Sequence, residues 1–294
     1  MSNSPPEASR AGSIVIHRGD NLPFLQGCAD DSFDLIYIDP PFNTGREQRR
    51  NRIRTTQVDA HGDRTGFAGR RYRTETLGSL AFDDAFDDYL EFLGPRLEHA
   101  RRVLKPSGSL FVHLDYREAH YVKVALDRLF GRRSFMNEII WAYDYGGRSK
   151  SRWPAKHDTI FWYAKDPAQA VFNYEELDRI PYMAPGLVTA EKAARGKTPT
   201  DVWWHTIVSP NGHEKTGYPT QKPIGVVGRL VRAHSNPGDE LLDFFAGSGT
   251  LGEAGAAGGR RVTLVDSNPE AINVMRTRLA KWRPTIREVA SPAI

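Results

Sequence analysis

Cysteine is almost absent from this sequence, and its scarcity excludes two kinds of stabilising chemistry. Cys28 is the only cysteine among 294 residues. Neither an internal disulfide framework nor a zinc site built on cysteines is therefore expected. The nine histidines are scattered, and none stands at a spacing typical of metal ligands. We expect a protein without a bound metal.

Long apolar runs are also missing. No stretch of about 18 apolar residues occurs, so the sequence predicts no membrane span. Residues 1–12 are polar and rich in proline and serine, which is typical of a loose, disordered tail rather than a signal peptide. With 39% hydrophobic and 26% charged residues, the composition is that of a soluble globular protein, and we expect a cytoplasmic location. The formal net charge of +4 favours a polyanionic partner.

Strands and helices alternate in both halves of the chain. Apolar runs predict strands, and apolar residues at helical spacing predict helices. The predicted strands cover 13–17, 33–38, 109–114, 138–143, 158–164, 240–244 and 261–265. The predicted helices are a short one ending at Gln26 and those at 83–104, 116–130, 224–233, 250–257 and 269–281. This alternation indicates one doubly wound, mostly parallel α/β sheet.

Two segments break the alternation. Residues 46–79 are rich in arginine and show no periodicity. We expect them to form a long, mobile basic loop that follows the residues at 39–42, with a solvated linker as the alternative. Residues 166–217 form the second segment and are expected to be a smaller inserted region. A third basic stretch, 146–153, joins two predicted strands. The side chains expected to contact nucleic acid phosphates are Arg46, Arg49, Arg50, Arg52, Arg148, Lys150 and Arg152.

The apolar run 33–38 ends in Asp39-Pro40-Pro41-Phe42. The two prolines fix the backbone and remove two N–H donors, so this turn offers only acceptors. One carboxylate, one carbonyl oxygen and one aromatic face suit a flat ring that carries an amino group. Taken alone, the same residues are equally well explained as a proline-stiffened turn with an exposed aspartate.

A glycine turn follows the predicted strand 240–244. The sequence from Gly247 to Gly252 has the pattern G-x-G-x-x-G, and Asp266 ends the next predicted strand. This layout suits a ligand whose ribose meets the acidic residue while its polar part lies at a helix N-terminus. NAD and S-adenosylmethionine both fit the turn. The residues at 39–42 favour S-adenosylmethionine, because hydride transfer has no use for them.

The segments 36–45 and 243–250 together closely resemble those of DNA amino-methyltransferases. The catalytic segment comes first and Thr220-Gln221-Lys222-Pro223 stands just before the glycine turn, which is similar to the β group of that family. The resemblance covers 13–45, 80–165 and 218–282. It implies a Rossmann-like methyltransferase sheet of seven mostly parallel strands with helices on both faces. The catalytic domain would comprise 13–165 and 218–283, with target recognition in 166–217.

The resemblance also implies a reaction and a site. S-adenosylmethionine would methylate the exocyclic N6 of an adenine flipped out of duplex DNA, as in restriction–modification systems. Asp39 and the Pro40 carbonyl would each accept a hydrogen bond from the amine. Pro41 would complete the catalytic turn, and Phe42 would stack on the base. The expected cofactor residues are Asp20, Thr220, Lys222, Asp243, Phe245, Gly247, Ser248, Gly249, Thr250, Asp266 and Asn268, with helix capping as the alternative role for Asp20. A homodimer and a cognate restriction nuclease are left open as partners.

Three other interpretations compete with adenine methylation. Cytosine-N4 methylation uses the same fold, although Asp at position 39 favours adenine and Ser is more often seen in cytosine-N4 enzymes. An NAD-dependent oxidoreductase shares the glycine turn but leaves Asp39 to Phe42 unexplained. An inactive DNA-binding module would not need the intact catalytic residues. We expect His113, Asp115, His157 and Asp158 to satisfy turns at strand ends.

Overall fold

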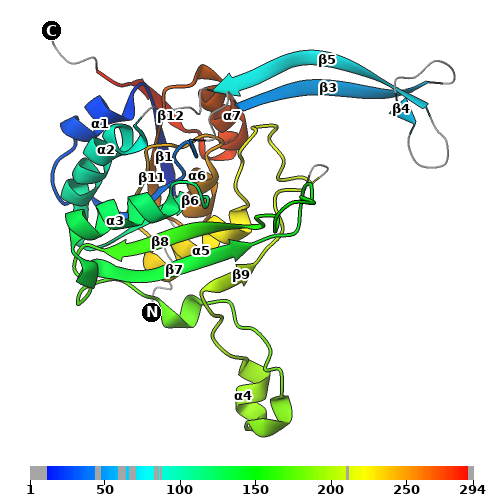
Figure 1. The fold of residues 1–294 in the computed structure, drawn as a ribbon. Helices are drawn as coiled ribbons and strands as arrows, with labels where there is room; N and C mark the ends of the chain where they lie inside the picture. The colour runs from blue at the N-terminus through cyan, green and yellow to red at the C-terminus, as the bar shows by residue number, and fades with distance from the viewer. Residues whose placement is uncertain are drawn as a thin grey trace, which may run out of the picture.

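The computed structural model describes residues 12–43, 48–58, 64–65, 71–82, 86, 88–209 and 212–290. Its centre is a sheet with the strand order β12-β1-β11-β10-β2-β6-β8-β7-β9 (Figure 1). The strands are β1 (Ser13–Arg18), β2 (Phe33–Ile38), β6 (Leu104–Leu114), β7 (Phe135–Ala142), β8 (His157–Ala164), β9 (Val202–Trp204), β10 (Glu240–Asp243), β11 (Arg261–Asp266) and β12 (Thr285–Glu288).

Most neighbouring strands in this sheet are parallel. From β12 to β6 every pair runs in the same direction, while β8 is antiparallel to both β6 and β7. The seven predicted strands are all present, so the doubly wound α/β sheet is confirmed. Two short edge strands, β9 and β12, were not predicted and extend the sheet to nine strands.

Helices cover both faces of the sheet, as its alternating side chains require. Within β2, Leu35 and Tyr37 belong to one apolar cluster, whereas Ile36 and Ile38 belong to the other. Strands buried on both faces show this near-continuous apolar sequence. One face packs against α1 (Asn21–Gly27), α2 (Tyr89–Val103) and α3 (Ala119–Phe130), and the other against α5 (Ile224–His234), α6 (Thr250–Ala257) and α7 (Pro269–Arg278).

The sheet brings the two chemical segments of the sequence together. Strands β2 and β10 are parallel neighbours, with Leu35 opposite Leu241 and Ile36 opposite Leu242. Their carboxyl ends therefore lie at the same edge of the sheet. Open α/β sheets bind ligands at that edge. The Asp39 turn after β2 and the glycine turn after β10 thus begin side by side.

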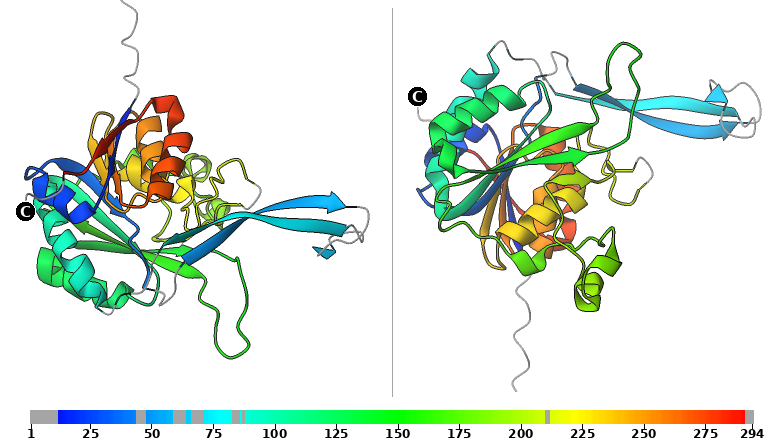
Figure 2. Two further views of the ribbon diagram at one scale, coloured as in Figure 1. Left: turned by 90° about the horizontal axis from the view of Figure 1, so that it is seen from above. Right: turned by 60° about the horizontal axis from the view of Figure 1, so that its bottom comes forward.

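The basic segment 46–79 is not the structureless loop that its sequence predicted. Strands β3 (Gln48–Val58) and β5 (Arg71–Phe82) pair antiparallel along their length, and β4 (Arg64–Thr65) adds to β5. This ribbon extends away from the sheet (Figure 2). The prediction was wrong because it required apolar periodicity, whereas the backbone hydrogen bonds of a two-stranded ribbon do not depend on an apolar face.

The inserted region 166–217 contains little regular structure. It holds α4 (Ala190–Arg195), which stands apart from the sheet in Figure 1, and β9, which pairs with β7. Two other boundaries differ from expectation. Helix α2 begins at Tyr89, where the Asp88 side chain caps it, and β6 begins at Leu104 rather than 109. Among the described helices, none is long and apolar enough to cross a membrane.

Candidate active site

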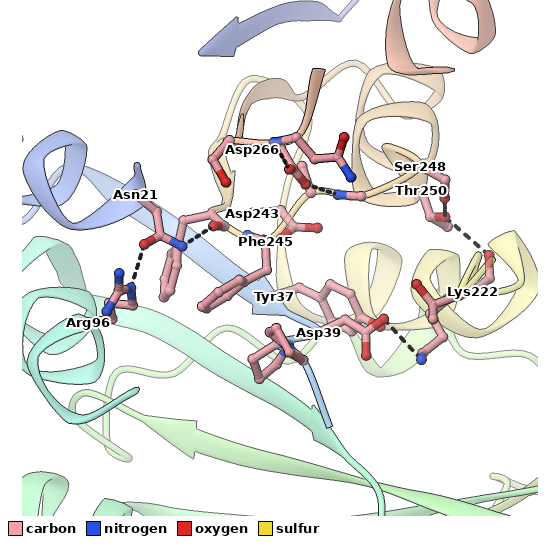
Figure 3. Close-up of a pocket in the computed structure, with 18 of the residues that line it drawn as sticks. Asn21, Tyr37, Asp39, Arg96, Lys222, Asp243, Phe245, Ser248, Thr250 and Asp266 are labelled. Atoms are coloured by element: carbon pink, nitrogen blue, oxygen red, sulfur yellow. Dashed lines mark hydrogen bonds and ion pairs between the residues drawn. The ribbon is translucent and has the colours of Figure 1, made fainter. Parts of the chain in front are cut away.

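A cavity of about 580 Å³ opens at the carboxyl edge of the sheet, between the two turns (Figure 3). Nearly every residue predicted to bind a cofactor or to act in catalysis lies in its wall. These residues are Asp20, Asp39, Pro40, Pro41, Phe42, Thr220, Lys222, Asp243, Phe245, Gly247, Ser248, Thr250, Asp266 and Asn268. Gly249 is not part of the wall and instead caps α6. The structure therefore brings these predicted residues together around one cavity.

Asp39 follows the last residue of β2, and its two carboxylate oxygens differ in their surroundings. Oδ2 lies 3.0 Å from the Lys222 ammonium, as the dashed line in Figure 3 marks. Oδ1 is buried and has no hydrogen-bond partner among the described residues. The Lys222 ammonium also lies 4.4 Å from the centre of the Phe42 ring. Asp39 thus has one oxygen in an ion pair and one buried oxygen without a partner among the described residues.

The glycine turn between β10 and α6 uses a backbone that favours glycine. Gly247 and Gly249 have φ values of 49° and 75°, in the left-handed region where a side chain is disfavoured. A Cβ on Gly249 would come within 2.8 Å of Met275. The Gly247 N–H donates to Asp266 Oδ2 at 2.8 Å, and the Asn268 N–H donates to Asp266 Oδ1 at 2.8 Å.

The acidic residues at this edge are strongly desolvated. Burial raises the pKa of Asp266, although its two backbone hydrogen bonds oppose the shift. Burial also raises the pKa of Asp243 well above its usual range, with further contributions from the charges of Asp39 and Asp266. Asp243 Oδ1 accepts a hydrogen bond from the Phe245 N–H at 2.9 Å. The closely spaced carboxylates favour ligand groups that donate hydrogen bonds or carry positive charge.

Some residues in the cavity wall, among them Arg96 and Asn21, were not predicted from the sequence. Arg96 on α2 is buried and donates to Asn21 Oδ1 at 2.5 Å and to Asp20 Oδ1 at 3.2 Å. Asp20 also caps α1 by accepting from the Leu22 N–H, so its capping role is confirmed. Asn21 in turn donates to the Phe244 carbonyl at 2.7 Å. Helical periodicity marked this part of α2 only as amphipathic, which does not single out a buried arginine.

Behind the Asp39 turn, four titratable side chains form a hydrogen-bonded chain. The Tyr37 hydroxyl lies 2.8 Å from His113 Nδ1, and His113 Nε2 lies 3.1 Å from Asp158 Oδ2. The Tyr143 hydroxyl donates to Asp158 Oδ1 at 3.0 Å. Burial acts to raise the pKa of Asp158, but the hydrogen bond and charge of His113 lead the contributions that lower it overall. His113 and Asp158 therefore belong to a buried hydrogen-bonded chain between strands, rather than only satisfying turns as the sequence predicted.

A second cavity of about 380 Å³ adjoins this region. Its wall includes Phe42, Tyr143, Asp158 and Arg152. Phe42 therefore borders both cavities. The segment 143–157 between β7 and β8 carries the predicted Arg148, Lys150 and Arg152, all exposed, and Trp153, whose side chain is 95% exposed.

The other predicted DNA contacts lie on or near the β3–β5 ribbon. Arg49, Arg50 and Arg52 are backbone positions of β3, and Arg46 lies outside the described residues. Within the described residues, no group of three or more His, Cys, Asp or Glu side chains is arranged to hold a metal ion.

Comparison with known families accounts for most of the chain. Residues 33–277 match a family model described as a DNA methylase of the N6/N4 type. The match includes β2, the Asp39 turn, the glycine turn and α7 as far as Thr277. It begins at Phe33, so β1 and α1 lie before it.

Two curated relatives and two solved structures are similar to the chain. Type II methyltransferase M.HpaI of Haemophilus parainfluenzae is 29% identical, over 87% of this chain and 70% of its own length. DNA adenine methyltransferase YhdJ of Escherichia coli (strain K12) is 28% identical, over 94% of this chain and 85% of its own length. The structure of an M1.HpyAVI–SAM complex is 21% identical with a TM-score of 0.57, and the match covers 90% of this chain and 98% of that chain. The structure of the cytosine-N4-specific PvuII DNA methyltransferase is 16% identical with a TM-score of 0.62, and the match covers 92% of this chain and 89% of that chain.

Proposed function

The chain belongs to the N6/N4 DNA methylase family, and we propose that it transfers the methyl group of S-adenosylmethionine to the exocyclic N6 of adenine in duplex DNA. One observation carries the proposal. The Asp39 carboxylate lies in the wall of the cavity that the glycine turn and Asp266 also line. This arrangement supports a site in which an amine acceptor and a nucleoside-type ligand would share one space.

The cavity residues fit S-adenosylmethionine in volume and in chemistry. A volume of about 580 Å³ lies within the range of small-molecule pockets. Asp266 is placed to accept hydrogen bonds from ribose hydroxyls, because each of its oxygens keeps a second lone pair. The rings of Phe92 and Phe245, whose centroids are 5.9 Å apart, offer an apolar wall for an adenine ring. Desolvated carboxylates at this edge suit a ligand that carries a sulfonium cation.

Asp39 and the Pro40 carbonyl would prepare the target nitrogen. The lone pair of an exocyclic amine is delocalised into the base, which makes the nitrogen a weak nucleophile. Two acceptors, each with a hydrogen bond from one N–H of the amine, would draw this nitrogen toward a tetrahedral geometry. The carboxylate would also complement the positive charge that develops on the nitrogen. The bound cofactor supplies an electrophilic methyl group. Most of the remaining acceleration comes from holding the two reactants in line.

The target base has to leave the duplex to reach Asp39, so we propose base flipping. Phe42 borders both cavities, which suits a ring that stacks on the extruded base while the amine turns toward Asp39. The loop 143–157 lies over the second cavity with Arg152 in its wall. Its exposed cations, Arg148, Lys150 and Arg152, and those of the β3–β5 ribbon would contact phosphates.

Cytosine-N4 methylation is the second candidate, because cytosine carries the same kind of amine and the PvuII enzyme has a similar fold. Asp at position 39 supports adenine, since Ser is the more frequent residue in cytosine-N4 enzymes. The name of the E. coli relative also supports adenine.

Expression in a methylation-free bacterial host tests the proposal. Genomic DNA from cells with the wild-type chain should contain N6-methyladenine at one short sequence, and DNA from cells with Asp39→Ala should contain none. Sequencing that detects modified bases would identify the base and its context together. N4-methylcytosine instead would support the second candidate. Unmodified DNA from cells that contain soluble, folded protein would contradict both.

A further inference from the structure

Lys222 is a buried cation whose position the surrounding fold defines closely. Its residue is 8% exposed, and it stands just before Pro223, which caps α5. Its backbone carbonyl accepts a hydrogen bond from Thr250 Oγ1 at 3.1 Å, which ties it to the first residue of α6. A buried lysine normally has a counter-ion. The counter-ion here is Asp39, with 3.0 Å between Nζ and Oδ2.

The Asp39 carboxylate is therefore held at one oxygen only. Its Oδ1 is buried and lacks a partner among the described residues. Buried polar atoms without partners are rare in native structures and call for an explanation. A ligand that brings an N–H donor into the cavity would supply the missing hydrogen bond.

Other groups around Asp39 would not hold it in place. Asp243 at the end of β10 and the phenols of Tyr37 and Tyr218 are its charged or titratable neighbours. The Asp243 carboxylate repels Asp39, and the Tyr37 hydroxyl is engaged with His113 Nδ1 at 2.8 Å. In the described part of the chain, Lys222 is the one cation in an ion pair with Asp39.

We propose that Lys222 is a positioning residue for methyl transfer. Its ammonium holds Oδ2 and thereby fixes the Asp39 side chain so that Oδ1 faces the target amine. The ammonium also lies over the Phe42 ring at 4.4 Å, so a single cation links the carboxylate and the stacking ring. This inference rests on the proposed function, and it differs from a contact between Lys222 and the cofactor carboxylate.

Two substitutions separate these roles. Lys222→Met keeps the length of the side chain and removes its charge, whereas Lys222→Arg keeps the charge. A misplaced catalytic group costs about 100-fold in rate, so we expect that loss in kcat for Lys222→Met, with S-adenosylmethionine affinity within about threefold of wild type by calorimetry. Lys222→Arg should recover most of the activity.

A double-mutant cycle covers the case in which Lys222→Met folds poorly. Asp39→Asn with Lys222→Met leaves no unpaired buried charge, and adding Lys222→Met to Asp39→Asn should lower kcat no further. Thermal unfolding measured alongside identifies any folding defect. Weakened cofactor binding with normal kcat at saturating cofactor would overturn the proposal, and so would additive losses in the cycle. A wild-type chain that methylates no DNA would instead refute the proposed function.

Discussion

Asp266 at the end of β11 joins two turns through a single carboxylate. Its Oδ2 accepts from the Gly247 N–H at 2.8 Å, and its Oδ1 accepts from the Asn268 N–H at 2.8 Å. Gly247 lies between β10 and α6, whereas Asn268 caps α7. The side chain therefore sets the spacing between two helix N-termini and still has lone pairs that face the cavity.

Asp266→Ala should weaken S-adenosylmethionine binding, because the ribose hydroxyls lose a charged acceptor. Hydrogen bonds to charged groups contribute about 1.5–3 kcal/mol, so we expect the Kd to rise about 10- to 100-fold by calorimetry. Asp201→Asn removes an exposed carboxylate remote from the cavity and serves as the matched control. Unchanged affinity in a folded Asp266→Ala protein would show that the ribose is bound elsewhere.

Gly249→Ala should destabilise the fold. The residue has a φ of 75° and a Cβ there would approach Met275 to 2.8 Å. A left-handed conformation costs a residue with a Cβ about 1–2 kcal/mol, and urea unfolding should show a loss of at least that size. Gly228→Ala is the control. Gly228 lies inside α5, where a Cβ would meet nothing closer than 3.5 Å, so alanine there should stabilise the protein by about 0.5–1 kcal/mol.

Equal losses for the two glycine variants would contradict this expectation. The difference between them depends on backbone conformation, since both residues sit at or in a helix and both gain only one methyl group. Cofactor affinity should also fall in Gly249→Ala, because the N-cap of α6 would shift beside Ser248 and Thr250 in the cavity wall.

The sequence predicted the parts of the fold that depend on local chemistry. The strand 33–38 matches β2, the helix 250–257 matches α6, and Asp266 ends β11 as expected. Apolar periodicity and glycine turns are properties of neighbouring residues, so they can be read without knowing the sheet order. Placing both turns at one cavity needed the neighbouring positions of β2 and β10 in the sheet, which the family resemblance supplied and local patterns do not.

Features that depend on distant pairing could not be predicted. The β3–β5 ribbon has arginines where an ordinary strand has apolar residues, so no alternation marked it. The edge strands β9 and β12 are short, and all four residues of β12 are exposed. The pairing of Lys222 with Asp39 requires β10 to lie beside β2, which neither local sequence reveals.

Asp39→Asn should abolish most catalysis while cofactor binding is preserved. The amide retains the size of the side chain but removes the charge that complements the developing positive charge on the target nitrogen. Loss of one preorganised electrostatic contact costs about 10²–10³-fold in kcat, and we expect a loss of this order in single-turnover methylation of DNA. The S-adenosylmethionine Kd should stay unchanged by calorimetry. Wild-type rates in this variant would exclude Asp39 from the reaction.

Stability should decrease when the pH falls from 7 to 5, partly because of His234. This ring packs against Trp162 with centroids 4.2 Å apart, and burial lowers the pKa of His234 to about 4 from 6.5. The unfolded chain thus binds a proton that the folded chain excludes between these values. The contribution of His234 to the unfolding free energy is therefore present above about pH 6.5 and is lost as the pH falls. By pH 5 the loss from this residue is about 2 kcal/mol.

His234→Gln tests this contribution, since it removes the titrating ring. Its unfolding free energy should be less sensitive to pH between 7 and 5 than that of the wild type. His120→Gln is the control, because it makes the same substitution at an exposed histidine on α3. Identical pH dependence in His234→Gln and the wild type would mean that the buried ring is protonated in the folded protein.

The basic loop 143–157 should contribute to DNA affinity through phosphates. Removing one phosphate contact from duplex DNA reduces the slope of log K against log salt by about 0.9, so Lys150→Ala and Arg152→Ala should each lower the slope by about that amount in fluorescence anisotropy titrations. Arg148 pairs with Asp144 at 2.6 Å, and its replacement should change the slope less. Lys281→Ala, beyond α7 and outside both cavities, is the control. Equal slopes for Lys150→Ala, Arg152→Ala and the wild type would place the DNA elsewhere on the protein.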